Sequence, residues 1–342
     1  MLPEQPDDWT EPGAYPVAPG VYRIPLPLPN DGLRAVNVYA VEDPAGLVLV
    51  DSGWAMDETE KAMTAGLRLL GYDLADVAEV AVTHAHGDHY TQAIALRATF
   101  GSRVRIGRGE RASIERLLGG DLGAYDDQYR QLRAYGATEL ADRLERWAAT
   151  AFNRGDMPWD LPDGWLDDGE QIRLRDRALD VIATPGHTQG HVVLRDSPAG
   201  LLFSGDHILP HITPSIGFEA VVARTPLRNY LASLRLVKDL PDTLLLPAHG
   251  RPTPSVHRRV DELLAHHEVR LAAVYREVQR GAPTAHAVAA TLRWTRRERT
   301  LAELDLFNQM LAVIETGAHL DVLVLQGELT CTEVDEVRHY ST

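Results

Sequence analysis

Residues 83–90 read Thr-His-Ala-His-Gly-Asp-His-Tyr, directly after the apolar, β-branched run Val77-Ala78-Glu79-Val80-Ala81-Val82. The run predicts a strand, and the stretch after it holds four potential metal ligands within six residues: His84, His86, Asp88 and His89. Imidazole and carboxylate groups are common ligands of zinc and related cations. The stretch therefore predicts a metal site where a strand leaves its sheet.

The spacing of these ligands indicates two metal ions rather than one. Alternate residues of an extended strand share a face, so His84 and His86 are expected to point the same way. Gly87 permits a sharp turn before Asp88 and His89. We therefore expect His84 and His86 on one ion and the other two ligands on a second. The alternative is a histidine-rich turn whose side chains are solvated.

Four other apolar runs end in turns that carry Asp or His. These runs and the residues that follow them are 47–50 before Asp51-Ser52-Gly53, 179–183 before Thr184-Pro185-Gly186-His187, 201–203 before Ser204-Gly205-Asp206-His207, and 244–246 before Pro247-Ala248-His249-Gly250. Strand ends that meet at one edge of a sheet bring such side chains together. We expect one site assembled from these distant parts of the chain.

Together the motifs resemble those of the metallo-β-lactamase superfamily, in the branch with the His-x-His-x-Asp-His signature that includes glyoxalase II. The resemblance covers residues 20–255 and implies an α/β fold, the αββα sandwich of that family. It implies two ligand sets and a bridging group: His84, His86 and His187 for the first metal, Asp88, His89 and His249 for the second, and Asp206 between them. It also implies that Asp51 accepts a hydrogen bond from a ligand imidazole.

The resemblance implies a hydrolase with two divalent metal ions, zinc in the first place and Fe or Mn as alternatives. Water held by such cations ionises near neutral pH, so a metal-bridging hydroxide is the expected nucleophile. Asp88 and Asp206 are the expected catalytic carboxylates, with Asp88 orienting the hydroxide. His207 is a candidate proton donor, and His211 is a second one.

A small-molecule thioester or related acyl compound is the favoured substrate. A thiolate leaves without protonation, and the motifs offer no obvious general acid. Hydrolysis of an amide or ester, as by a β-lactamase or lactonase, is one alternative, and phosphodiester cleavage by a nuclease is another. An iron oxidoreductase is disfavoured by the complete second ligand set and by a tail too short for a flavin domain. A non-enzymatic metal-binding relic is disfavoured by the presence of all seven ligands.

Two residues near the motifs have expected structural roles, and the single cysteine is expected to have none in catalysis. His191 is expected to anchor the loop that carries His187 through a buried hydrogen bond. Tyr90 stands where family members often have small residues, and we expect it in the core rather than on substrate. Cys331 lies in a polar tail and is expected to have no catalytic role.

Thr225-Pro226 predicts the start of a helix, with Thr as N-cap and Pro at the first helical position. Arg224 and Arg228 lie close to this start. We expect both on the solvated surface rather than bound to a substrate carboxylate.

The chain is expected to divide into three parts. Residues 1–20 form an N-terminal arm, and residues 21–255 form the catalytic domain, in which 109–168 is a helical lid over the site. The alternative for 109–168 is a helical layer on the outer face of the sheet. Residues 256–342 resemble the winged-helix tail of one subgroup, with three helices and a short strand at 320–325. This tail contains more acidic than basic residues, which suits packing or homodimer contacts better than DNA binding.

Composition limits the remaining classes. The net charge of −15 disfavours a nucleic-acid partner, because phosphate binding needs basic surface. The single cysteine fits a reducing compartment. The N-terminus lacks the pattern of a signal peptide, and no apolar run is long enough for a membrane span. A cytoplasmic location is the expectation.

Overall fold

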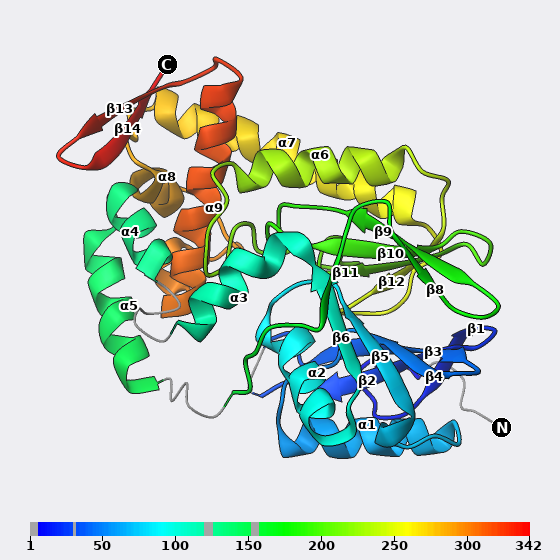
Figure 1. Cartoon of the computed structure of the whole chain (residues 1–342). Coiled ribbons are helices and arrows are strands. Elements are labelled where there is room, and N and C mark those ends of the chain that lie inside the picture. The colour runs from blue at the N-terminus through cyan, green and yellow to red at the C-terminus, as the bar shows by residue number, and fades with distance from the viewer. Residues whose placement is uncertain (1–5, 30–31, 120–125, 152–156) are drawn as a thin grey trace.

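The computed structural model describes residues 6–29, 32–119, 126–151 and 157–342. Within these residues, two β-sheets pack face to face, and helices cover the outer face of each sheet (Figure 1). This is the mixed α/β fold, an αββα sandwich, that the sequence predicts.

The first sheet has seven strands in the order of the chain. Strands β1 to β4 run antiparallel, whereas β4 to β7 are parallel. Helices α1 and α2 pack on its outer face (Figure 1). The bounds are β1 (Tyr15–Ala18), β2 (Val21–Pro27), β3 (Ala35–Asp43), β4 (Gly46–Val50), β5 (Val77–Val82), β6 (Arg103–Gly107), β7 (Gly164–Leu166), α1 (Asp57–Leu69) and α2 (Gly87–Phe100).

The second sheet has five strands in the order β12-β11-β10-β9-β8. Helices α6 and α7 cover its outer face, where apolar side chains of both helices join a buried cluster (Figure 1). The bounds are β8 (Gln171–Arg173), β9 (Ala178–Ala183), β10 (Val192–Asp196), β11 (Leu201–Gly205), β12 (Leu244–Pro247), α6 (Pro226–Lys238) and α7 (Val256–Gln279).

A buried apolar layer holds the two sheets together. Tyr39 of β3 meets Phe203 of β11 edge to face, with ring centroids 5.3 Å apart. Val50 and Leu246 belong to the same cluster. Central strands are therefore covered on both faces, which is why the sequence shows them as continuous apolar runs instead of alternating ones.

Strand pairing brings the expected loops to one edge. Val50, the last residue of β4, is paired with Ala81 of the parallel strand β5. In the second sheet, Gly205 of β11 is paired with Pro247 of the parallel strand β12. The loops that follow these four strands therefore begin side by side.

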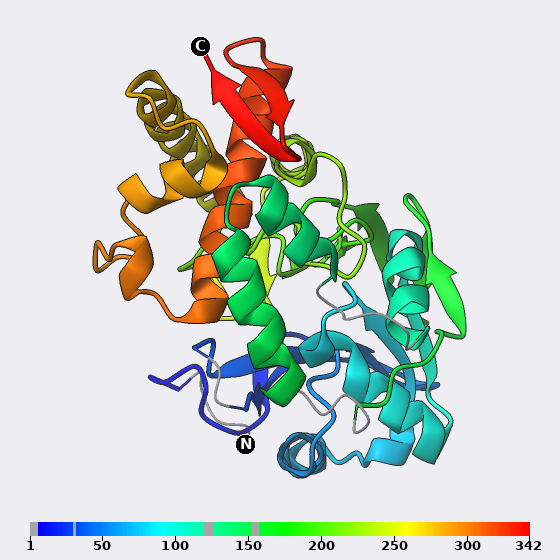
Figure 2. The same cartoon turned by 90° about the vertical axis from the view of Figure 1, so that its left-hand side faces the viewer.

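Helices from the middle and the end of the chain form one further body beside the sandwich (Figure 2). Apolar residues of α4 and α5 share a buried cluster with α7, α8 and α9, including Leu132, Leu144 and Val313. The helices are α3 (Arg111–Leu118), α4 (Asp126–Ala134), α5 (Thr138–Ala151), α8 (Ala285–Thr291) and α9 (Leu306–Leu325). Helices α4 and α5, which fall within the expected lid, therefore bury their apolar faces against the tail, and the expected division of the chain stays a prediction. Residues 120–125 and 152–156 of the expected lid lie outside the described residues.

The tail differs from expectation in its elements. Residues 320–325 continue α9 instead of forming a strand, because Leu320 and Leu323 are buried at helical spacing against neighbouring helices. A hairpin of β13 (Thr330–Val334) and β14 (Val337–Ser341) follows. Its turn residues Asp335 and Glu336 both have positive φ, as two-residue hairpin turns require. The likeness to a winged helix stays a prediction.

Two smaller differences concern local signals. Residues 15–18 of the expected arm form β1, which pairs with β2. The helix predicted at Pro226 is confirmed, but the Thr225 side chain makes no capping hydrogen bond.

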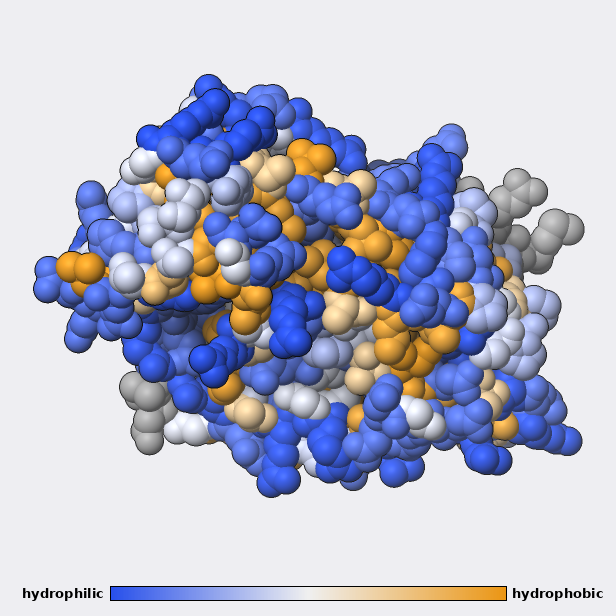
Figure 3. Space-filling view, turned by 90° about the horizontal axis from the view of Figure 1, so that it is seen from above, coloured by the Kyte–Doolittle hydropathy of each residue, from blue (hydrophilic) through white to orange (hydrophobic). Residues whose placement is uncertain are grey.

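Viewed over α6 and α7, the surface is mostly hydrophilic, with hydrophobic residues in a band between polar ones (Figure 3). Leu236 of α6 and Val269 of α7 are large apolar side chains that lie exposed. In the part of the chain that the structure describes, no helix has the length and apolarity that crossing a bilayer requires.

Candidate metal centre

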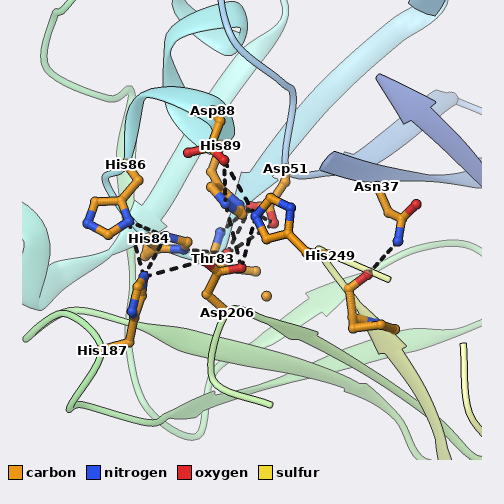
Figure 4. A network of polar contacts seen from close by, with 12 residues as sticks. Asn37, Asp51, Thr83, His84, His86, Asp88, His89, His187, Asp206 and His249 are labelled. Atoms are coloured by element: carbon orange, nitrogen blue, oxygen red, sulfur yellow. Dashed lines mark hydrogen bonds and ion pairs between the residues drawn. The ribbon is translucent and has the colours of Figure 1, made fainter. Parts of the chain in front are cut away.

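The predicted ligands come together at the edge where the two sheets end (Figure 4). They follow four strands, β5, β9, β11 and β12, and Asp88 and His89 lie in the first turn of α2. Asp51, the predicted partner of a ligand, follows β4. β5 ends at Val82 and α2 begins at Gly87, so His84 and His86 lie in a connecting loop rather than on the strand itself. Their side chains nevertheless point to one centre.

The first group consists of His84, His86, His187 and Asp206. His84 Nε2 lies 3.0 Å from His86 Nδ1, and His187 Nε2 lies 3.2 Å and 3.1 Å from these two atoms. Asp206 Oδ2 is 3.5 Å from His187 Nε2. Three ring nitrogens and a carboxylate oxygen therefore converge on one small volume.

The second group consists of Asp88, His89 and His249. Asp88 Oδ2 lies 3.5 Å from Nε2 of both histidines. The other oxygen of Asp206, Oδ1, lies 3.4 Å from His249 Nε2 and 3.8 Å from His89 Nε2. Asp206 thus presents one oxygen to each group, which is the geometry expected of a bridging carboxylate.

Backbone carbonyls fix the orientation of three of the imidazoles. The outer nitrogen of each ring meets a carbonyl oxygen: His86 Nε2 with Phe218 at 2.6 Å, His187 Nδ1 with Ser215 at 2.6 Å, and His249 Nδ1 with Ala35 at 2.7 Å. A carbonyl only accepts, so the outer nitrogen carries the proton. The inner nitrogen of each ring is left with a lone pair for a cation.

Asp51 and Thr83 fix the other two imidazoles. Asp51 accepts from the Thr83 backbone N–H at 2.8 Å, from the Thr83 hydroxyl at 3.0 Å and from His89 Nδ1 at 2.9 Å. Since the hydroxyl donates to Asp51, its oxygen is free to accept from His84 Nδ1, 3.0 Å away. Asp51 therefore stands where the sequence places it, against a predicted ligand.

His191 connects two of the loops. Its Nε2 accepts a hydrogen bond from the backbone N–H of Asp206 at 3.2 Å, and its Nδ1 lies 2.9 Å from the Thr184 hydroxyl. The residue is fully buried. His191 therefore contacts the loop that carries His187, as expected, and also the loop that carries Asp206.

The two groups differ in their electrostatics. Burial lowers the pKa of His187 to about 3 and that of His84 well below its ordinary value, so both rings are neutral. Burial also opposes a charge on His89, but the nearby carboxylates, Asp88 foremost, outweigh it and raise the pKa of His89 to about 10. Binding of a cation by the second group therefore displaces a proton.

Unsatisfied buried atoms test whether the residues fit metal ions. Among the described residues, His89 Nε2, His249 Nε2 and Asp206 Oδ1 are buried without a hydrogen-bond partner. Each such atom costs about 1–3 kcal/mol unless something satisfies it. All three face the same centre, and a cation there would satisfy them together. The donor set of imidazoles and carboxylates fits two divalent cations.

Several other residues that the sequence analysis considered for a role at the site lie away from the metal centre. His207, the candidate proton donor, is wholly buried, and its ring packs edge to face on Tyr230 instead of facing the open site. Tyr90 is buried, stacks on Trp159 and donates to the Asp160 carbonyl at 2.8 Å, so it belongs to the core. His211, Arg224 and Arg228 are exposed, and Cys331 is a half-buried free thiol on β13.

Asn37 is a supporting residue that the sequence reasoning missed. Its Nδ2 donates to the carbonyls of Pro247 and Gly250 at 2.9 Å and 2.7 Å, which flank His249 in the sequence. Its Oδ1 accepts from the buried Arg23 at 2.9 Å. The sequence offered one sign of this role, because Asn37 is a polar residue within the apolar run that begins β3.

Glu110 and Glu219 were also missed, and they brace the loop after His187. Glu110 hydrogen-bonds the Thr188 hydroxyl, and Glu219 accepts from the Gln189 backbone N–H at 2.8 Å. Both carboxyl groups are buried. No local pattern marks either residue, because each acts on a loop far away in the sequence.

Comparison with known proteins identifies the family. The probable metallo-hydrolase YqjP of Bacillus subtilis (strain 168) is 27% identical over 90% of this chain and 92% of its own. A crystal structure of a beta-lactamase domain protein from Burkholderia ambifaria matches with a TM-score of 0.80 and 28% identity, covering 98% of this chain and 96% of that one. A hydroxyacylglutathione hydrolase of Aeromonas hydrophila is 41% identical over 25% of this chain and 31% of its own. The family model described as the metallo-beta-lactamase superfamily matches residues 31–249. The chain belongs to the metallo-β-lactamase superfamily.

Proposed function

We propose that this protein is a metal-dependent hydrolase that holds two divalent cations, zinc in the first place, and cleaves a thioester or a related acyl bond. One observation carries the proposal. All five imidazoles of the centre have their outer nitrogens engaged, so their inner nitrogens face one another and the carboxylates of Asp88 and Asp206. This arrangement is built for cations rather than for packing.

The two carboxylates have distinct positions in the proposed reaction. Asp206 faces both groups, which supports a role in holding both ions. The Asp88 side chain retains 13% exposure, and we assign it the proton of the attacking water. When bound, the cations polarise the acyl carbonyl and bring the pKa of water near neutrality. The water oxygen then bonds to the acyl carbon, the carbon–sulfur bond breaks, and sulfur leaves as a thiolate.

The thioester preference rests on the leaving group. A thiolate is stable near neutral pH and needs no proton donor, whereas an amine does. His207, the candidate donor, packs on Tyr230 inside the fold. The match to a hydroxyacylglutathione hydrolase, whose name denotes an acyl conjugate of glutathione, supports the same substrate class.

The test combines metal analysis with a substrate panel of acyl thioesters, lactones, β-lactams and phosphodiesters on the full-length protein. We expect about two metal ions per chain and the highest kcat/KM on a thioester. Asp206→Ala should lower metal content and hydrolysis together, hydrolysis by roughly 100-fold or more. Asp57→Ala, at an exposed position in the first turn of α1, is the matched control and should change neither.

Wild-type turnover by Asp206→Ala would refute the bridging role. A higher kcat/KM on lactones, β-lactams or phosphodiesters than on every thioester would refute the substrate class while leaving the metal centre in place.

A further inference from the structure

A surface cavity, open to solvent and of about 480 Å³, lies where α3, α4, α9 and β14 meet the segment before α6. Figure 2 shows α4 and the terminal hairpin close together at this end of the helical body. None of the seven predicted metal ligands lines it. It is therefore a site distinct from the metal centre.

Positive charge dominates the lining of this cavity. Among the described residues, four guanidinium groups line it against two carboxylates, Asp127 and Asp321. This leaves an excess of two positive charges in a chain whose net charge is −15. The four arginines come from α3, from α4, from the segment before α6 and from β14: Arg116, Arg130, Arg224 and Arg338.

The carboxylates do not engage all four arginines. Asp321 binds Arg338 through two contacts, of 3.1 Å and 2.5 Å. Asp127 pairs with Arg130 and lies 3.8 Å from Arg116, too far for a good hydrogen bond. Among the described residues, Arg224 has no ion pair. Arg116 and Arg224 therefore retain donors that an anion could use.

A neutral polar group adds to the site. Gln131 lines the cavity, and its Oε1 is buried with no hydrogen-bond partner in the described part of the chain. The other end of the amide donates to the Tyr135 hydroxyl at 3.3 Å. The Oε1 atom is closed off from solvent, so Gln131 lines the cavity with its other atoms and adds no charge to it.

We propose that this cavity binds a phosphorylated small molecule. A phosphomonoester carries about two negative charges at neutral pH and offers several acceptor oxygens to guanidinium groups. It would neutralise the excess of two charges, whereas one carboxylate would neutralise only half. The volume lies within the range of small-molecule pockets, so it admits a ligand larger than phosphate itself.

One loop connects this cavity with the metal centre. Val222, Ala223 and Arg224 line the cavity, and Phe218, four residues before Val222, accepts the hydrogen bond from His86. Gln128 of α4 donates to the Glu219 carbonyl at 2.6 Å, which fixes the loop between the two sites. A ligand in the cavity would thus contact the loop that orients a predicted metal ligand.

The test is isothermal titration of the full-length protein, as purified, with AMP, inorganic phosphate and adenosine. We expect AMP and phosphate to bind and adenosine not to bind. Arg224→Ala should weaken AMP binding by about tenfold or more, because a hydrogen bond to a charged group contributes about 1.5–3 kcal/mol. Arg116→Ala should act in the same direction. Arg228→Ala, which removes a nearby exposed arginine that does not line the cavity, is the matched control and should leave the affinity unchanged.

Each other outcome overturns the proposal. Equal affinity of wild type and Arg224→Ala for AMP would place the ligand elsewhere, for example at the metal centre. Adenosine binding as tightly as AMP would exclude phosphate recognition, and no heat with AMP or phosphate at millimolar concentrations would exclude the site. Thermal unfolding of each variant shows whether it is folded. Because Arg116 and Arg224 lie in different parts of the fold, the test can still be made if one of the two variants fails to fold. Because hydrolysis is not the readout, failure here is separate from failure of the proposed hydrolase.

Discussion

Asp51 Oδ2 accepts a hydrogen bond from His89 Nδ1 at 2.9 Å, and both side chains are almost completely buried. Asp51 adopts a positive φ of 60°, a conformation that is rare for residues other than Gly, Asn and Asp. This backbone places its carboxylate between Thr83 and His89. One residue therefore orients, directly and through the Thr83 hydroxyl, a predicted ligand in each metal group.

Asp51→Asn should weaken metal binding by roughly 10–100-fold, because the carboxylate that fixes His84 and His89 is replaced by a neutral amide. Asparagine tolerates the positive φ, so the loop should keep its shape. Competition with a chromophoric chelator measures the affinity. Asp57→Asn, in the exposed first turn of α1, serves as the control. Unchanged affinity in Asp51→Asn would show that the interaction does not tune the site.

His207→Phe should retain metal content and keep kcat within about threefold of wild type. Both ring nitrogens of His207 are buried without a hydrogen-bond partner among the described residues, and the ring packs edge to face on Tyr230. An apolar ring keeps that contact and removes two unsatisfied atoms, which is neutral or stabilising. Steady-state kinetics and a thermal melt check this. A loss of kcat by two orders of magnitude with normal metal content would restore His207 as a proton donor.

Glu110→Gln should flatten the dependence of stability on pH. Burial raises the pKa of Glu110 to about 7, and burial together with Glu110 raises that of Glu219 to about 8, from an ordinary value of 4.5. The two carboxyl groups therefore stay protonated to a higher pH in the folded protein than in the unfolded chain. Their contribution is therefore complete below pH 4.5 and is lost as the pH rises through 7 and 8, at about 1.4 kcal/mol per pKa unit.

Urea unfolding between pH 5.5 and 8.5 measures this dependence. Wild type should lose stability across the interval, and Glu110→Gln should lose less of it. Glu115→Gln, at an exposed site on α3, should follow wild type. Parallel curves for wild type and Glu110→Gln would contradict the assignment.

Tyr90→Phe should lower the free energy of unfolding by about 1 kcal/mol and leave KM and kcat unchanged. The Tyr90 hydroxyl donates to the Asp160 carbonyl, so removing the hydroxyl removes one hydrogen bond from that carbonyl. The phenylalanine ring can still stack on Trp159. Denaturant titration and kinetics separate the two effects. A raised KM with unchanged stability would instead indicate that Tyr90 contacts substrate.

The sequence by itself predicted the seven candidate metal ligands that the fold brings together. His84, His86, Asp88 and His89 are close in the chain, and His187, Asp206 and His249 each follow an apolar run at a sheet edge. These local patterns can be recognised without knowing how the strands are arranged, because the loop after a strand always lies at the edge of its sheet. The two-layer sandwich was implied by the resemblance to the metallo-β-lactamase superfamily, and the continuous apolar runs agree with strands covered on both faces.

Only the tertiary structure decided what surrounds these residues. The carbonyls of Phe218, Ser215 and Ala35 hold three imidazoles, and any residue type could supply a carbonyl. The packing of α4 and α5 against the tail could not be predicted from the sequence either. An apolar helix face indicates that the face is buried, but it does not indicate which element covers it. The arginine cavity draws on segments more than 200 residues apart, from Arg116 to Arg338, so its charge exists as a site only once the chain has folded.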